Sequence, residues 1–461
     1  MFALQQSRSI AHTFSRPRPC MLTRNFAAFL AIAAATPACA QSMSAPAYSE
    51  DERPIVVGVA ISNEAALTPL SLDDALGIAV QNNPTLRGAR ADADASQGTF
   101  IQAGVRPNPE MSFLQEGFGG TERTTTALVN QTVELGGKRR ARQDVASYGR
   151  EVALASLDGR AAALRSDVVV AFYGLLASQR HLQVAQESAA IALRSAELAE
   201  KRARVGKVSP VEATKARVAA TGAQIEFVNA RIRVSTAVEK LANVTGSPLV
   251  QGRFAIGDIE TVPPVEPLSQ LLQRLTDAPL SRIARAEMLR SNAAISVERA
   301  RRIPDITFSA GIKRVITGGI RDNQAVVGVS IPLPLFDSNK GALLEAVHKA
   351  EKANADFESE RARLQLELTQ AYANYESSTQ AARQLKTDVL PASRQALDAV
   401  SRGYELGKFS FLDVLDAQRT LFQGQSQYVQ ALTDAHLAYA DIGRLVGMPL
   451  RTHADQTTNL P

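Results

Sequence analysis

The sequence contains very little cysteine and no tryptophan, and both shortages limit what the protein can be. The only two cysteines among 461 residues, Cys20 and Cys39, lie within the first forty positions. Without that segment the chain has no thiol for a disulfide or a cysteine-bound metal. Aromatic residues make up 5% of the chain, which is few for the globular cores of a chain this long. The abundance of alanine and leucine instead favours long helices with small packing residues.

Acidic residues are absent from the same forty positions, which hold four arginines. Removing these four from the 51 basic residues of the chain leaves 47, against 46 acidic ones. The body of the protein is therefore almost neutral and has no basic excess with which to bind nucleic acid.

The first forty residues have the order of an export signal. Arg24 precedes an apolar run at 26–35, and the small residues of Ala38-Cys39-Ala40 form a cleavage site before Gln41. The run is too short to span a bilayer as a helix. We expect cleavage between Ala40 and Gln41, with Met21 as a possible true start. The alternative, acylation of Cys39, lacks the leucine that such sites prefer three positions upstream.

Long hydrophobic runs are also missing from the rest of the chain, where no stretch reaches 18 uncharged apolar residues. A mature chain that enters a membrane must then do so with β-strands that close a barrel.

Signatures of catalysis are missing as well, because neither a Gly-x-Ser-x-Gly elbow nor a His-Glu-x-x-His helix occurs. The glycine cluster at 117–120 resembles a hairpin tip and not a phosphate loop. We expect no enzyme activity and no cofactor.

The body of the chain is one unit repeated twice. Pro84–Arg90 matches Pro279–Arg285 at an offset of 195 residues, and Gly206–Ser209 matches Gly407–Ser410 at an offset of 201. We expect a signal peptide at 1–40, an N-terminal extension at 41–70, a first repeat at 71–249, a linker at 250–270, a second repeat at 271–450 and a tail at 451–461.

Each repeat is predicted to contain the same elements in the same order. In the first repeat Ser71 caps a helix at 72–106, strands follow at 109–118 and 124–134, and a long helix covers 138–205. Ser209 and Pro210 then start a helix that ends at Gly246. The second repeat is expected to place a helix at 275–303, strands at 304–315 and 324–334, and helices at 340–406 and 410–446, with Pro391 interrupting the helix at 340–406.

Helix lengths constrain the architecture. A helix of about 68 residues extends for about 100 Å, and the two shorter helices of a repeat can stack end to end beside it. Each repeat then has a β-hairpin at one end and an αα-turn at the other. Four strands cannot close a membrane barrel, because the smallest such barrels have eight. The fold class is therefore mainly α with a small β part, in an oligomeric tube.

Several segments resemble TolC-like outer-membrane efflux proteins. The resemblance covers about residues 71–450 and is carried by LDDAL at 72–76, NNPTL at 82–86, VSIPLPLFD at 329–337 and GYELGKFSFLDVLDAQ at 403–418. QTVELGGKR at 131–139 is most similar to the branch that serves cobalt–zinc–cadmium cation pumps.

The resemblance implies a homotrimer with a twelve-stranded barrel in the outer membrane and a helical tube, or α-barrel, in the periplasm. It further implies docking, through a periplasmic adaptor, to an inner-membrane pump of the resistance-nodulation-division class. Heavy-metal cations are the expected cargo. Export of drugs or of secreted protein by the same fold is one alternative, and a periplasmic coiled-coil adaptor that never inserts is another.

Acidic residues follow both αα-turns. Glu212 and Asp413 match at the offset of 201, and Asp416 lies one helical turn after Asp413. Threefold symmetry would turn each into a ring of carboxylates that attracts cations. The resemblance implies that Asp413 and Asp416 constrict the periplasmic entrance, that Tyr404 helps to hold it shut, and that Lys408 lies one residue from the usual basic partner. The alternative is that these acids only stabilise helix starts.

Other polar residues are interpreted more conservatively. We expect His181, His348 and His436 to be surface or packing residues and not metal ligands. The basic run at 138–140 is interpreted as a solvated or head-group-facing helix start. Glu134 could line the lumen or occupy an ordinary exposed position.

Overall fold

A computed structural model describes residues 68–448, which all belong to the unit Glu64–Pro461. The signal peptide, the cleavage site at Ala40 and Gln41, Met21, most of the N-terminal extension and the tail at 451–461 lie outside the described residues. These expectations remain predictions.

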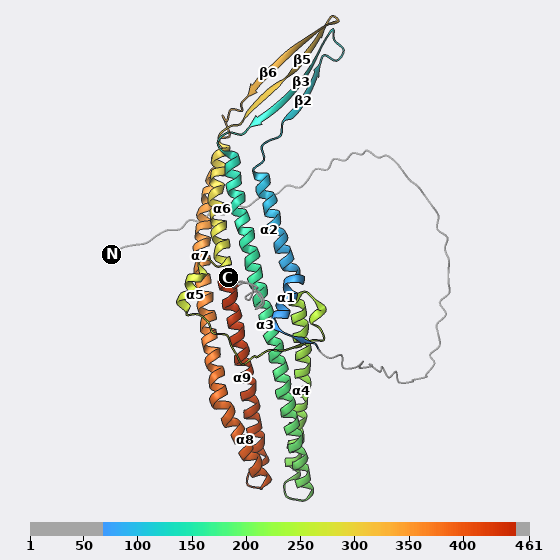
Figure 1. Cartoon of the computed structure of the whole chain (residues 1–461), viewed down its shortest axis with the longest axis vertical. Coiled ribbons are helices and arrows are strands. Elements are labelled where there is room, and N and C mark those ends of the chain that lie inside the picture. The colour runs from blue at the N-terminus through green and yellow to red at the C-terminus, as the bar shows by residue number, and fades with distance from the viewer. Residues whose placement is uncertain (1–67, 449–461) are drawn as a thin grey trace, which may run out of the picture. The chain divides into compact units, whose positions relative to one another are not determined.

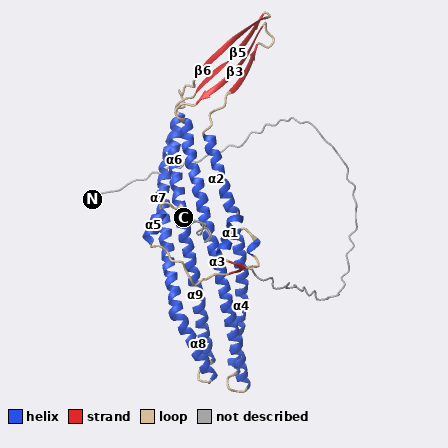
Figure 2. Ribbon diagram, viewed as in Figure 1, coloured by secondary structure: helices blue, strands red, loops and turns tan. Residues whose placement is uncertain are grey.

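Helices form most of the described chain, and a sheet continues from their ends (Figures 1 and 2). In the first copy the elements are α1 (Leu72–Asn82), α2 (Pro84–Ala103), β2 (Glu110–Glu116), β3 (Glu122–Val133), α3 (Lys138–Arg204) and α4 (Pro210–Thr245). In the second they are α5 (Leu268–Leu275), α6 (Pro279–Arg301), β5 (Ile306–Thr317), β6 (Ile320–Ser330), α7 (Lys340–Gln384), α8 (Leu390–Glu405) and α9 (Phe411–Val446). A short parallel pair, β1 (Pro69–Leu70) with β4 (Phe254–Ala255), joins the two ends of the first copy.

The first predicted helix is two helices, because the chain breaks at Asn83. Its ψ of 121° is extended, and its side chain accepts a hydrogen bond from the Leu86 N–H while its amide donates to the Val244 carbonyl. Pro84 disfavours helical geometry at the residue before it and has no N–H to donate. The prediction of one helix at 72–106 was wrong at this point. In the second copy, likewise, α5 and α6 are separate helices.

Pro391 interrupts the long helix of the second copy, as predicted. Five residues, Leu385–Val389, form a π-helical turn between α7 and α8. The wider turn accommodates a proline that can neither donate to the preceding turn nor fit beside its carbonyls. The long helix of the first copy, α3, has no proline and continues without a break.

The helices are arranged in columns around α3. This helix contacts α2 and α4 of its own copy and α6 and α9 of the other, while α7 packs against α6 and α9. By length and composition alone α3 could also cross a membrane, but half of the apolar stretch concerned is buried in the fold. Several of its buried residues, including Val168, Phe172 and Leu175, belong to the largest core cluster of the described residues. The apolar face of α3 therefore serves helix packing.

The four long strands form one antiparallel sheet in the order β2-β3-β5-β6. The central pair joins the copies, with Val129 opposite Ala310 and Gln131 opposite Phe308. Because side chains alternate between the faces of a strand, this register sorts the residues into two sets. One face carries Met111, Phe113, Val129, Val133, Phe308, Ile312, Val327 and Val329. The other carries Ser112, Asn130, Thr132, Thr307, Ser309 and Lys313.

The polar face is tied together by hydrogen bonds between side chains. Asn130 donates to Ser112 at 3.2 Å and accepts from Ser309 at 2.7 Å, and the hydroxyls of Thr132 and Thr307 are 3.1 Å apart. One apolar and one polar face are what a strand set needs to separate lipid from a water-filled lumen.

His436 on α9 is buried where the two copies meet the segment that links them. Its ring is 0% exposed, stacks on Tyr173 of α3 at 3.6 Å between centroids, and places Nε2 2.9 Å from the Ile259 carbonyl. Burial lowers the pKa of this imidazole below its ordinary value. His436 is thus a packing residue, as expected, and it folds as the neutral form.

This burial predicts a pH-dependent stability. Stabilisation by the neutral His436 ring is complete above the ordinary histidine pKa of about 6.5 and is lost as pH falls below it. We expect His436→Gln to lower the thermal unfolding midpoint at pH 7.5 and to flatten its decline between pH 7.5 and 5.5. The exposed His348→Gln is the matched control. An equal decline in both variants would contradict the assignment.

Candidate functional site

Two αα-turns lie together at the end of the helices farthest from the sheet (Figure 1). Gly206 and Gly407 occupy left-handed positions with φ of 72° and 75°, a conformation that glycine adopts without steric cost. Ser209 and Ser410 then cap the helices that follow, α4 and α9. The turns predicted from the repeated Gly-Lys-x-Ser motif are confirmed.

Between the turns, three residues from different helices form what we call the Tyr404 cluster: Arg202 of α3, Glu212 of α4 and Tyr404 of α8. The Tyr404 hydroxyl donates to Glu212 Oε1 at 3.1 Å, and Arg202 Nη1 donates to the Tyr404 carbonyl at 2.6 Å. The Arg202 guanidinium also lies 4.6 Å from the centre of the Tyr404 ring. The cluster therefore fastens the first copy to the second beside both turns.

The cluster is set in a small apolar core. Tyr404 is buried and packs at 5.8 Å against the ring of Phe411, with Ala196, Ala199 and Val414 around them. Burial, and then the charge of Glu212, raise the pKa of the Tyr404 hydroxyl. The hydroxyl is therefore protonated at neutral pH and available as a donor.

Gly403 explains how the chain closes so tightly here. A Cβ at this position would lie 2.1 Å from Cδ2 of Phe409, so any side chain would displace that ring. Position 403 matches Arg202 at the offset of 201. At this matched position the first copy has Arg202, which bonds to Tyr404, and the second copy has Gly403, which leaves room for the Phe409 ring. The alignment of the two copies does not reveal this difference in role.

The remaining entrance candidates are exposed. Asp413 Oδ2 accepts hydrogen bonds from the Ser410 N–H and hydroxyl, both at 2.8 Å, and these bonds lower its pKa. Asp413 is therefore a helix-capping residue whose carboxylate also faces solvent. Asp416 and Lys408 are exposed beside it. The structure brings Tyr404 and Glu212 into contact, whereas rings formed by Asp413 and Asp416 remain a prediction.

The ELGGK segment lies at the junction of sheet and helices. Asp305 accepts the Leu135 N–H at 3.1 Å and the Lys138 ammonium at 2.7 Å, and Glu134 binds Arg142 with an Nη2–Oε2 distance of 3.0 Å. Gly136, with φ of 69°, sits against Ile303 of the other copy. The expectation of a solvated start was wrong for Lys138, since its side chain is 14% exposed. Glu134 is likewise a paired junction residue and not an ordinary exposed one.

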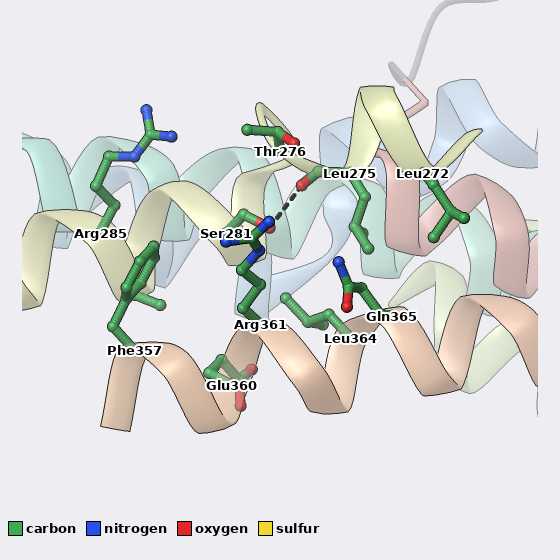
Figure 3. A pocket seen from close by; sticks show the side chains of 11 residues that line it. Leu272, Leu275, Thr276, Ser281, Arg285, Phe357, Glu360, Arg361, Leu364 and Gln365 are labelled. Atoms are coloured by element: carbon green, nitrogen blue, oxygen red, sulfur yellow. Dashed lines mark hydrogen bonds between the residues drawn. The ribbon is translucent and has the colours of Figure 1, made fainter. Parts of the chain in front are cut away.

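No group of three or more His, Cys, Asp or Glu within 68–448 has the spacing to hold a metal ion. A cavity of about 140 Å³ lies between α5, α6 and α7 (Figure 3). It is lined by leucines such as Leu275 and Leu364, and its one serine, Ser281, already donates to the Leu275 carbonyl at 2.6 Å. Glu360 and Arg361 line the same cavity, and Glu360 accepts a hydrogen bond from Arg363 Nε at 2.8 Å.

Comparison with known proteins agrees with this geometry. The family model described as outer membrane efflux protein matches residues 75–247 and 273–448. The cobalt-zinc-cadmium resistance protein CzcC of Cupriavidus metallidurans is 40% identical over 83% of this chain and 91% of its own length. The nickel and cobalt resistance protein CnrC of the same organism is 29% identical, over 66% of this chain and 72% of its own. The solved structure of the outer-membrane channel OprN superposes with a TM-score of 0.71 at 20% identity, covering 82% of this chain and 90% of that one.

We predict that the Tyr404 cluster holds the two turns together. Tyr404→Phe removes one hydrogen bond and Arg202→Gln removes a charge-assisted one, so each should cost about 1–3 kcal/mol of local stability. With one cysteine placed on each turn, the rate of disulfide formation between them should then be lower in each variant than in the double-cysteine protein without the substitution. Arg204→Gln, two residues away and 79% exposed, is the matched control. Unchanged trapping in both variants would contradict the assignment.

Proposed function

Because the chain belongs to the outer membrane efflux protein family, we propose that three copies form the exit channel of a pump that expels heavy-metal cations. The observation that carries this proposal is the sheet, which has one apolar face, one polar face and two open edges, and which leads directly into long helical columns. Such a unit suits one third of a continuous duct through the outer membrane and into the periplasm.

The open edges support a closed ring of several chains. Within 68–448, the outer backbone edges of β2 and β6 have no partner strand. Unpaired backbone groups are costly in lipid, so membrane strands occur in closed barrels. Pairing β6 of one chain with β2 of the next supplies the missing partners. Three chains then contribute twelve strands, within the range of known barrels.

The cargo is proposed from the relatives. CzcC and CnrC are named for resistance to cobalt, zinc, cadmium and nickel, and CzcC shares 40% identity with this chain. Export of drugs or of secreted protein through the same channel is the second candidate. The adaptor alternative, a coiled coil that never inserts, does not agree with family membership.

The proposed partners follow from the same assignment. The αα-turn end would meet a periplasmic adaptor, which connects the channel to an inner-membrane pump of the resistance-nodulation-division class. Outer-membrane lipid would surround the apolar sheet face. Transport would need no chemistry in this chain, because the pump supplies the energy.

We test the cargo by deleting the gene. The deletion strain should lose tolerance to zinc, cobalt and cadmium, while its tolerance to detergents and hydrophobic drugs should stay at the parental level. Complementation with the full chain should restore the metal phenotype. Loss of drug tolerance with normal metal tolerance would favour the second candidate.

We also propose that Asp413 and Asp416 form the cation-attracting constriction at the periplasmic end. Two carboxylates per chain would give six in a trimer, a ring that concentrates cations and is blocked by multivalent ones. In planar bilayers, Asp413→Asn with Asp416→Asn should raise conductance and weaken block by trivalent cations. The matched control is Asp434→Asn, farther along α9. Wild-type conductance and block in an assembled double variant would place the constriction elsewhere.

A further inference from the structure

Three arginines gather on the apolar face of the sheet at the hairpin end. The register places Arg123 of β3 opposite Ile316 of β5, and Ile316 opposite Arg321 of β6. Arg314 lies two residues before Ile316 on β5 and so points to the same face. With strands about 4.8 Å apart, the Cα atoms of Arg123 and Arg321 are separated by about 10 Å. We call these three residues the arginine triad.

The triad marks the end of the apolar band. Closer to the helices, the same face of β5 carries Ile306, Phe308, Ala310 and Ile312. The next residue on this face is Arg314. A change from aliphatic to guanidinium side chains along one strand face is what the boundary between hydrocarbon and head groups requires.

The triad's charge is not neutralised within the described chain. All three side chains are exposed, and none is in an ion pair between residues 68–448. Arg314 uses only Nε, which donates to Asn323 Oδ1 at 3.0 Å. Its two terminal nitrogens remain directed to neither a carboxylate nor a carbonyl of the described residues.

The nearest acidic residues lie on the other face. Glu122 and Asp322 are sequence neighbours of Arg123 and Arg321, so alternation directs their side chains away from the triad. There Glu122 accepts a hydrogen bond from Thr317 at 3.2 Å, and Asp322 accepts one from Gln324 at 2.9 Å. The positive charge of the triad thus lies on the apolar face, whereas Glu122 and Asp322 lie on the polar face.

We propose that the arginine triad binds the phosphate groups of an anionic lipid in the outer leaflet. Guanidinium groups bind phosphate through paired, charge-assisted hydrogen bonds. Three of them around one isoleucine, Ile316, offer both the charge for a phosphorylated head group and an apolar surface for the start of its acyl chains. The inference rests on the proposed function, because it requires the apolar face to contact lipid and the hairpins to face the cell exterior.

The experiment uses the purified full-length protein in a neutral detergent and diphosphoryl lipid A as the probe. Bound lipid per oligomer is counted by native mass spectrometry across a titration. Arg123→Gln with Arg314→Gln and Arg321→Gln should weaken binding by roughly a hundredfold, which corresponds to about 3 kcal/mol at 1.4 kcal/mol per tenfold change. This is the sum expected when each basic residue near an anionic lipid surface contributes about 1 kcal/mol. Added salt should weaken wild-type binding more than binding by the triple variant.

The matched control is Lys313→Gln. Lys313 is the sequence neighbour of Arg314, carries the same charge and points to the opposite, polar face. It should bind lipid A as the wild type does. Inorganic phosphate added at millimolar concentration should compete only weakly, which separates a lipid site from a free-anion site.

Equal retention of lipid A by the wild type and the triple variant would overturn the inference, as would equal loss in Lys313→Gln. The same spectra report oligomer mass, and bilayer recordings report conductance. A trimeric, conducting triple variant that still retains lipid A would refute lipid binding by the arginine triad and would leave the proposed channel function intact. A wild type that is monomeric or non-conducting would refute the proposed function itself.

Discussion

Backbone hydrogen bonding at the two outer strands is the constraint on which the rest of the structure depends. The sheet β2-β3-β5-β6 satisfies its three internal ladders, but one edge of β2 and one edge of β6 have no partner strand among residues 68–448. In water such edges can be solvated, whereas in lipid they must be paired. Since the two edges belong to different copies of the repeat, each chain presents a first-copy edge and a second-copy edge. Head-to-tail pairing of these edges can therefore close a ring.

Duplication also lets the two copies take different tasks. Position 202 holds an arginine that reaches across to Tyr404, and its counterpart Gly403 leaves space for Phe409. Glu212 accepts a hydrogen bond from the other copy, whereas its counterpart Asp413 caps its own helix. The same duplication at the sheet end joins Leu135 and Lys138 to Asp305. Contacts between the copies thus fix both ends of the helical columns.

Local signals in the sequence predicted most of the fold. Ser209-Pro210 and Gly246 bound α4 where capping chemistry places its ends, and the alternation in residues 124–134 identified β3. The break at Asn83 was missed because the asparagine and proline there were interpreted as part of one helical pattern; the amide bond to Val244 that accompanies it depends on the tertiary fold. Arg202 was missed for the same reason, since within its own helix it is one basic residue in a basic last turn. Asn83 and Arg202 have partners 161 and 202 positions away, and contacts at such separations give no local signal in the sequence.

In the proposed trimer, β2 of one chain pairs with β6 of another in a ring of three. The predicted mature chain has no cysteine, so any disulfide that forms must join the engineered cysteines. One cysteine replaces Ser112 on β2, and a second scans Gln324, Val326 and Gly328 on the same face of β6. Two strands separate β2 from β6 within a chain, which places them about 14 Å apart, too far for a disulfide. We predict that oxidised outer membranes give covalent dimers and trimers and nothing larger. Oxidised monomers with an internal disulfide, or a ladder that continues beyond three chains, would contradict it.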